Sequence, residues 1–260
     1  MKKRFIAVLW IILSIIGLSN HQTVYAESGR VIVVTTPLEF INAIGPDRVI
    51  HLNAEVFELP AHKIEISNRY VTQEKVNDGY QLRIHDVKNL SITGIGEKPV
   101  KLLAKPRYAY ILVFSDSDNL KINKIEAGHT PGDFGCLSGV LNFINCRNIE
   151  INDSVLFGCG SEGVDLEDVV NFKFKNSIIK DCIFGIMNIR NSTNCEFEDS
   201  VFQGNVGWYL INIAQSEDIN FSKCRIKDNI SEDSDYGSIF DVSESERILI
   251  SDCIVENNTA

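Results

Sequence analysis

The amino-acid sequence predicts an all-β solenoid: a single-stranded parallel β-helix with a helix covering its N-terminal end. The first observation is a repeated sequence template. It consists of a short segment with alternating apolar residues, then an Asp or Asn, then a second Asn, and then another short segment with alternating apolar residues. It repeats every 23 residues between Phe143, Leu166 and Ile189. Further copies are anchored at Ile84, Phe114, Ile213 and Val242. A period between about 20 and 50 residues is typical of solenoids.

The second observation is that two polar columns keep their register from coil to coil. One contains Asn89, Asn119, Asn148, Asn171 and Asn194, followed by Asp218 and Arg247; the other contains Cys159, Cys182, Asn205, Asn229 and Asn258. Asparagine tolerates a left-handed backbone, and its amide can bond to the amide one coil away. We therefore expect these residues to turn the corners between strands.

The first 26 residues predict a signal peptide. Lys2, Lys3 and Arg4 precede the apolar run 5–18, and small residues at 24–26 suit cleavage after Ala26. The alternative, an uncleaved anchor, is disfavoured because a spanning helix needs about 20 apolar residues. We therefore divide the chain into a signal peptide, 1–26, and a β-helix domain, 27–260, that is secreted, periplasmic or on the cell surface.

Composition narrows the class of partner. The chain has 260 residues, 44% hydrophobic and 23% charged, which is ordinary for a soluble protein. Cleavage would remove three positive charges and no negative ones, taking the formal net charge from −10 to −13. Such a charge disfavours nucleic acid and, after cleavage, membrane surfaces as partners.

The domain begins with a cap and a first coil over 27–59. We expect a strand over 31–34, then a helix over 35–45 that is capped by Thr36, has Pro37 at its first position and ends at Gly45. Its apolar face would contain Leu38, Ile41 and Ile44, and it would cover the open end of the solenoid. Strands follow at 49–52 and 56–59. We expect an irregular loop over 60–79 and regular coils over 80–260.

Seven cysteines in an exported protein raise the question of disulfides. Cys136, Cys159 and Cys182 share one register, so they would stack about 4.8 Å apart. Cys224 and Cys253 form a second column. The thiols either fill the core or form a Cys136–Cys159 disulfide. A metal site is disfavoured because no Cys-x-x-Cys pair is present.

A family resemblance accompanies these patterns. The pattern from Thr35 to Leu59 and the glycine-cysteine runs at 128–136 and 158–160 resemble the right-handed parallel β-helix, pectin-lyase-like superfamily. Within it, the chain is similar to bacterial secreted right-handed β-helix repeat proteins. The resemblance covers about nine tenths of the chain and implies a substrate lying along the outer face of one sheet. It does not imply one activity, since the fold hosts lyases, hydrolases, adhesins and scaffolds.

The register predicts which side chains line that face. The first outward column contains Arg83, Val113, Asn142, Asp165, Asn188, Asn212 and Asp241; the second contains His85, Ser115, Ile144, Glu167, Arg190, Ala214 and Ser243. Amides, carboxylates and a guanidinium suit sugar hydroxyls or carboxylates. We expect substrate contacts from Asn142, Asp165, Glu167, Asn188, Arg190 and Asn212. The alternative is a solvated face with one cross-strand ion pair.

Two insertions, 126–136 and 230–237, lead into the same strand of the coil. The first would bring His129 and Asp133 towards the coil that carries Asn142, one coil from Glu162 and Asp165. The histidine could there act as a general base, or the carboxylates could hold calcium. The alternative is a histidine that only makes structural hydrogen bonds.

The motifs of known enzymes do not carry over. The stretch after Gly163 superficially resembles a polygalacturonase, but the paired aspartates and the later histidine and arginine motifs are missing. An inverting hydrolase could use only Glu162 with Asp165 or Asp181, and a lyase could use only Arg190 as its base.

The functional prediction is therefore a protein that binds polysaccharide, with cleavage by a lyase or hydrolase reaction left open. The candidate catalytic residues are His129, Asp133, Glu162, Asp165 and Arg190. No cofactor is expected, although calcium stays open. The alternative is a non-catalytic surface or structural protein. An exposed last coil would also allow a homodimer.

Overall fold

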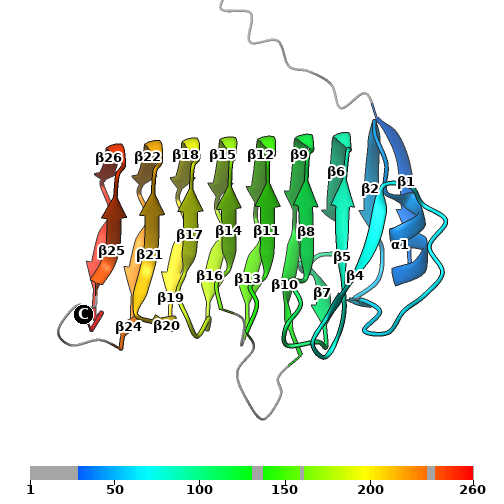
Figure 1. Cartoon of the computed structure of the whole chain (residues 1–260), viewed down its shortest axis with the longest axis horizontal. Helices are drawn as coiled ribbons and strands as arrows, with labels where there is room; N and C mark the ends of the chain where they lie inside the picture. The colour runs from blue at the N-terminus through cyan, green and yellow to red at the C-terminus, as the bar shows by residue number, and fades with distance from the viewer. Residues whose placement is uncertain (1–28, 131–136, 159–160, 233–237, 260) are drawn as a thin grey trace, which may run out of the picture.

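The chain winds into an elongated solenoid in which successive coils stack side by side (Figure 1). The computed structural model describes residues 29–130, 137–158, 161–232 and 238–259. The proposed signal peptide and the residues Asp133, Cys136 and Cys159 lie outside the described residues. Within the described ranges, no helix is both long and apolar enough to cross a membrane.

Three sheets run along the solenoid. Sheet I contains β1 (Arg30–Val34), β2 (Arg48–Leu52), β6 (Lys88–Gly94), β9 (Asp118–Asn123), β12 (Arg147–Asn152), β15 (Val170–Lys175), β18 (Thr193–Glu198), β22 (Glu217–Ser222) and β26 (Glu246–Ser251). Sheet II contains β3 (Val56–Glu58), β7 (Val100–Ala104), β10 (Ile125–His129), β13 (Val155–Phe157), β16 (Ile178–Lys180), β19 (Val201–Gln203), β23 (Arg225–Lys227) and β27 (Ile254–Glu256). Sheet III contains β4 (Val71–Val76), β5 (Gly79–His85), β8 (Leu112–Ser115), β11 (Leu141–Ile144), β14 (Val164–Glu167), β17 (Met187–Arg190), β21 (Tyr209–Ala214) and β25 (Ser238–Ser243). A small fourth sheet joins β20 (Val206–Gly207) and β24 (Ile230–Ser231).

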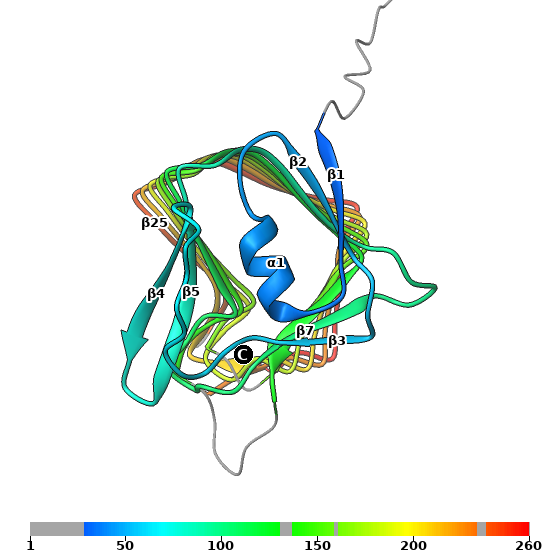
Figure 2. The same ribbon diagram turned by 90° about the vertical axis from the view of Figure 1, so that its right-hand side faces the viewer.

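The strands pair in the register that the sequence repeat predicts. In sheet III, Leu141 pairs with Val164, Val164 with Met187, and Met187 with Ile211. All four side chains point inward and are at most 1% exposed. The three sheets enclose this core, as the view along the axis shows (Figure 2). The predicted parallel β-helix is therefore confirmed.

Stacked phenylalanines fill much of the interior. The ring centroids of Phe114 and Phe143 are 5.0 Å apart, and those of Phe197 and Phe221 are 4.7 Å apart, both pairs being nearly parallel. Phe172 lies between these pairs, 5.6 Å from Phe197. Each coil thus places an aromatic ring against the next, which favours close packing along the axis.

The predicted asparagine columns turn the corners. Asn119 donates from Nδ2 to Oδ1 of Asn89 at 2.7 Å, and Asn194 donates to Asn171 at 2.8 Å. The four residues have φ between 55° and 63°, in the left-handed region that asparagine tolerates.

The second column is buried at Cys182, Asn205 and Asn229 and half-buried at Asn258. Asn205 and Asn229 are 0% exposed, and the Nδ2 of Asn229 donates to Oδ1 of Asn258 at 2.9 Å. The backbone N–H of Asn205 donates to Oδ1 of Asn229 at 2.9 Å. This column therefore supplies the polar partners that a buried turn needs.

Helix α1 (Pro37–Ala43) lies across the N-terminal end of the solenoid (Figure 2). Thr36 caps it and forms a capping box with Glu39, and Pro37 occupies its first turn, as predicted. The prediction for Leu38 was wrong, because its side chain is 52% exposed. Phe40 takes the buried position instead and is 0% exposed, because it packs against the first coil.

The prediction of an irregular loop over 60–79 was partly wrong. Strand β4 pairs antiparallel with β5, from Val71 opposite Ile84 to Val76 opposite Gly79. The turn residues Asn77 and Asp78 before Gly79 are a hairpin signal, and this signal was overlooked.

The described cysteines are free. Cys146, Cys182, Cys195 and Cys224 are buried, and Cys253 is half-buried. The backbone N–H of Cys224 lies 3.3 Å from Sγ of Cys253, which confirms that these two stack in one column.

Candidate active site on sheet III

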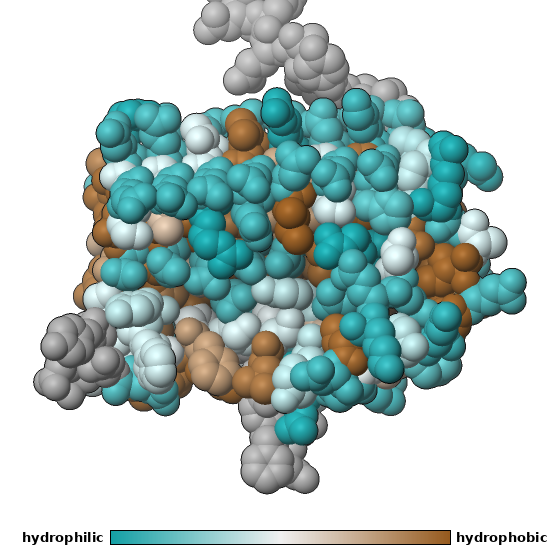
Figure 3. All heavy atoms as spheres, in the orientation of Figure 1, coloured by the Kyte–Doolittle hydropathy of each residue, from teal (hydrophilic) through white to brown (hydrophobic). Residues whose placement is uncertain are grey.

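The predicted outward row is present on sheet III. Asn142 pairs with Asp165, Asp165 with Asn188, and Asn188 with Asn212. One position further along, Glu167 pairs with Arg190. Figure 3 shows this face, which is hydrophilic over most of its middle and carries pale and hydrophobic side chains along its lower part.

Tyr110 is the central residue of the site, and the sequence analysis did not identify it. Its Oη lies 2.7 Å from Oδ2 of Asp165 and 3.1 Å from Oε1 of Glu162. Tyr110 precedes β8, in the register that Gly139 and Glu162 occupy before β11 and β14. Extending the column analysis two residues ahead of the strands would have found it.

The hydrogen-bond inventory of these three side chains requires an additional proton. A phenol hydroxyl carries one proton and can donate to only one of the two carboxyl groups. The shorter contact assigns this donor to Asp165. The contact with Glu162 is satisfied when Glu162 is protonated and donates to the tyrosine oxygen. The three side chains then form one chain, from Glu162 through Tyr110 to an ionised Asp165.

The electrostatics agree with this assignment. Burial and the nearby charge of Asp165 raise the pKa of Glu162, whose residue is only 8% exposed. Burial also raises the pKa of Asp165, although the hydrogen bond from Tyr110 and the charge of Arg190 oppose the shift. Burial and both carboxylates raise the pKa of Tyr110, which keeps its hydroxyl protonated. The site thus holds two neighbouring carboxyl groups whose pKa values are both raised.

Arg190 balances part of the negative charge. Its Nη2 lies 3.4 Å from Oδ1 of Asp165 and 3.3 Å from Oε2 of Glu167. Burial lowers the pKa of Arg190, but the charges of Asp165 and Glu167 raise it by more. The net shift is upward, so the guanidinium stays charged. One cation thus faces two of the site's acidic groups.

Asn142 lies on the other side of Asp165. Its Nδ2 donates to Oδ2 of Asp165 at 3.2 Å. Within the described parts of the chain, neither Asn142 Oδ1 nor Asp165 Oδ1 accepts a hydrogen bond, although both atoms are buried. An unpaired buried acceptor costs about 1–3 kcal/mol, and such groups concentrate at functional sites.

Gly139 makes the Tyr110 contacts possible. A Cβ on Gly139 would lie 2.7 Å from the Glu162 carbonyl oxygen and 2.7 Å from Cε1 of the Tyr110 ring. The Tyr110 side chain therefore passes over a coil that has no side chain at this position. Only glycine leaves this space.

The structure pairs the His129 ring with a backbone carbonyl. It is 1% exposed, and its Nε2 bonds to the carbonyl of Ala109 at 2.7 Å. Burial lowers its pKa. Asp181, the other acid considered, is exposed and lies 3.8 Å from Nζ of its neighbour Lys180. Asp165 is thus the acid that the fold brings to Glu162.

The acidic side chains of the site are engaged with other side chains. In the described ranges, no three His, Cys, Asp or Glu side chains come together as metal ligands. Asp165 is already paired with Arg190, and its other oxygen accepts from Tyr110.

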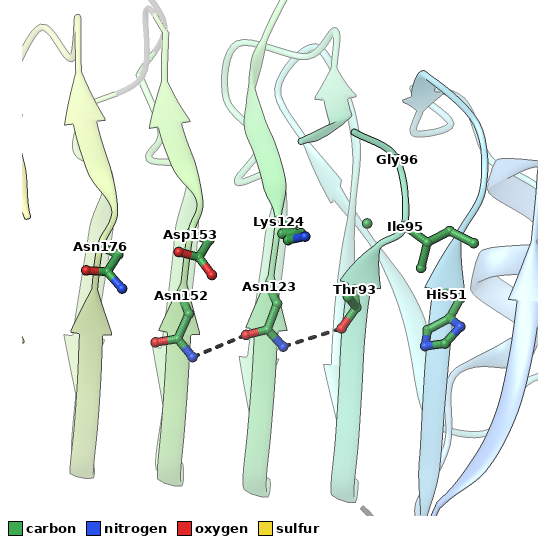
Figure 4. A pocket seen from close by; sticks show the side chains of 10 residues that line it. His51, Thr93, Ile95, Gly96, Asn123, Lys124, Asn152, Asp153 and Asn176 are labelled. Carbon is green, nitrogen blue, oxygen red and sulfur yellow. Dashed lines mark hydrogen bonds between the residues drawn. The ribbon is translucent and has the colours of Figure 1, made fainter. Parts of the chain in front are cut away.

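A separate polar groove of about 470 Å³ lies where sheet I turns towards sheet II (Figure 4). Its floor is a ladder in which Asn152 donates to Asn123 at 3.2 Å and Asn123 donates to Thr93 at 3.3 Å. His51 and Asn176 line the groove at either end of this ladder. These amides pair with each other, so the groove shows less reactive chemistry than sheet III.

The fold and the site define a parallel β-solenoid that carries an acidic cluster on the outer face of one sheet. The family model for the right-handed β-helix region matches residues 107–260, so the chain belongs to that family. No curated protein matches the chain by sequence.

Several solved structures are similar in fold. A putative glycosyl hydrolase from Parabacteroides merdae is 12% identical, with a TM-score of 0.38, over 67% of this chain and 77% of that one. The surface protein and adhesin PfbA from Streptococcus pneumoniae is 11% identical, with a TM-score of 0.48, over 83% and 74%. An alginate lyase from a Paenibacillus species is 10% identical, with a TM-score of 0.43, over 89% and 99%.

Proposed function

We propose that this protein binds polysaccharide along sheet III and hydrolyses it with Glu162 and Asp165. The observation that carries the proposal is the single Tyr110 hydroxyl shared by both carboxyl groups, at 3.1 and 2.7 Å. Two acids held at different protonation states are what glycoside hydrolysis needs.

In the proposed reaction, Glu162 donates its proton to the glycosidic oxygen while the bond from that oxygen to the anomeric carbon breaks. The Asp165 carboxylate bonds to the anomeric carbon as the leaving group departs. Water then attacks this carbon while its bond to Asp165 breaks, and the water gives a proton to Glu162, which restores the starting state.

The separation of the acids predicts the stereochemical outcome. Because both contact one oxygen atom, the contacting oxygens are at most about 6 Å apart, below the roughly 6.5–9.5 Å of inverting enzymes. We therefore expect retention of configuration.

Elimination fits the site less well. A lyase reaction needs a base that removes a proton, and Arg190 was the candidate base. Its charge is stabilised by Asp165 and Glu167. Arg190 is therefore suited to orienting Asp165.

The test is incubation of the protein with neutral and acidic polysaccharides, with and without calcium, followed by mass spectrometry of new chain ends. Hydrolysis yields saturated ends that have gained water, and elimination yields unsaturated ends. Glu162→Gln and Asp165→Asn should each reduce turnover at least a hundredfold. The matched control is Glu196→Gln, an exposed acid on sheet I that pairs with Lys173.

The pH profile provides an independent test. Activity requires ionised Asp165 and protonated Glu162, and both pKa values are raised. The profile should be bell-shaped, with both limbs above the ordinary carboxyl values.

In the analysis of chain ends, unsaturated ends would overturn hydrolysis. If the protein binds a glycan but produces no new chain ends, the result favours the competing function, a non-catalytic binding protein.

Binding along the row has its own test. Replacing Asp165 and Asn188 with Ala should weaken glycan binding, since both lie in one outward column. Unchanged binding would place the glycan elsewhere.

We further propose export and self-association. The basic and apolar residues at 1–26 support export, and N-terminal sequencing of protein from the medium would test cleavage after Ala26.

In the last coil, Val242 and Ile250 are each 45% exposed, and their partners Ile213 and Phe221 are 0% exposed. A second copy could cover this surface, and a monomer by light scattering at all concentrations would overturn the dimer.

A further inference from the structure

Three aromatic side chains are exposed beside the acidic cluster. Phe184 is 52% exposed, Trp208 is 68% exposed and Tyr209 is 43% exposed. Phe184 lies three residues before β17, on the coil after Glu162, and Trp208 lies in the same register on the following coil. The rings therefore extend from the acids along the solenoid axis.

The backbone holds these rings in place. A Cβ on Gly207 would lie 2.5 Å from the Phe184 carbonyl oxygen, so the two coils are in close contact at this point. The carbonyl of Trp208 accepts a hydrogen bond from Oγ of Ser231 at 2.8 Å. The rings are thus presented from paired backbone, and their exposure costs free energy unless a ligand covers them.

A glycine also separates Glu162 from Tyr209. Gly185 lies between them in the column that begins with Tyr110 and Gly139. Because Gly185 has no side chain, its position leaves room for a ligand that passes from the aromatic rings to the acids.

The charge of the site selects against anionic ligands. Asp165 and Glu167 share a single cation, Arg190. The formal net charge of the chain is −10. A polyuronate would bring further carboxylates into this field, whereas the apolar face of an uncharged sugar ring packs on an aromatic ring without that cost.

We propose that Phe184, Trp208 and Tyr209 form a stacking platform for an uncharged glycan that runs along the solenoid axis into the acidic cluster. The coils repeat at about 4.8 Å, close to the length of one sugar unit, so successive sugars would lie over successive coils. This proposal rests on the proposed function for its chemistry at Glu162, but it is tested by binding.

The experiment measures the affinity of the full chain for uncharged oligosaccharides by calorimetry, with uronate oligomers as the comparison. Trp208→Ala should weaken binding of the uncharged ligand about tenfold, and Phe184→Ala should weaken it by a similar factor. Trp208→Phe should restore most of the affinity. Leu249→Ala, which removes an exposed apolar side chain from sheet I, is the matched control.

Fluorescence gives a direct readout at the platform. The chain has two tryptophans, Trp10 and Trp208, so a Trp10→Phe background reports Trp208 alone. An uncharged ligand should shift its emission. Tighter binding of uronates than of uncharged ligands, or unchanged affinity in both alanine variants, would overturn the proposal.

The two proposals fail differently. If the platform exists without hydrolysis, Trp208-dependent binding persists and the wild-type chain releases no products. If hydrolysis occurs without the platform, products form and both alanine variants bind like wild type. Glu162→Gln should abolish cleavage and retain binding when both proposals hold.

Discussion

Tyr110 and Asp165 are joined by a 2.7 Å hydrogen bond although an entire coil lies between them. Tyr110 precedes β8, Asp165 lies on β14, and β11 separates the two strands. The contact exists because Gly139, on the intervening coil, has no side chain. The site therefore depends on three coils that are distant in sequence.

Gly139→Ala should destabilise the protein by about 1–3 kcal/mol, because the new methyl group would collide with the Tyr110 ring and the Glu162 backbone. Chemical denaturation measures the effect. Gly96→Ala is the control, since a Cβ there meets only the Lys98 backbone, at 3.2 Å. Equal losses in both variants would mean that the space over Gly139 is not required.

Glu162→Gln should change how stability depends on pH. Burial and Asp165 raise the pKa of Glu162 above 4.5, so its contribution is fully present below 4.5 and is lost as the pH rises through the folded-state value. The free energy of unfolding of wild type should fall over this range relative to the variant, and the variant should be the more stable at neutral pH. Parallel curves for the two proteins would contradict the raised pKa.

Asn229→Ala should cost about 1–3 kcal/mol, because it removes the Oδ1 acceptor of the buried backbone N–H and side-chain amide of Asn205. Thermal and chemical denaturation both report this loss. Asn123→Ala, in the open ladder of sheet I, should change stability by no more than about 0.5 kcal/mol. A similar cost at both positions would show that burial of the column does not matter.

The described cysteines should differ in their reactivity. Burial raises the pKa of the Cys195 thiol to about 12, and Cys182 is fully buried, so neither should be alkylated in the native protein. Half-buried Cys253 should react first among the five. Peptide mapping after timed alkylation checks the order. Labelling of Cys182 as fast as Cys253 would contradict the packed core.

Local patterns predicted the repetitive parts of the fold well. The 23-residue spacing of Phe143, Leu166 and Ile189 predicted the strand register, and the asparagine columns predicted the corners. Both succeed because, in a solenoid, a fixed spacing along the chain becomes a fixed neighbour in space. The hairpin after residue 70 and the exposed Leu38 were mispredicted, because they belong to the cap, where the period does not hold.

The candidate site was predicted only in outline. The outward row containing Asn142 and Asp165 follows from strand alternation, and it lies where the sequence placed it. Glu162 and Asp165 were also predicted as a pair, whereas their link through Tyr110 is visible only in the structure. The sequence places His129 on an insertion towards the coil of Asn142 and leaves open a structural role, and the structure buries it against the carbonyl of Ala109.

The sequence by itself determined the coil, its period and the face on which each strand residue lies, because these depend on neighbours at a constant spacing. Only the tertiary structure decided the electrostatics of the site. The pKa shifts of Glu162 and Asp165 arise from burial and from a hydroxyl two coils away. Desolvation and the reach of a side chain over Gly139 are properties of packed coils, and no single repeat contains them.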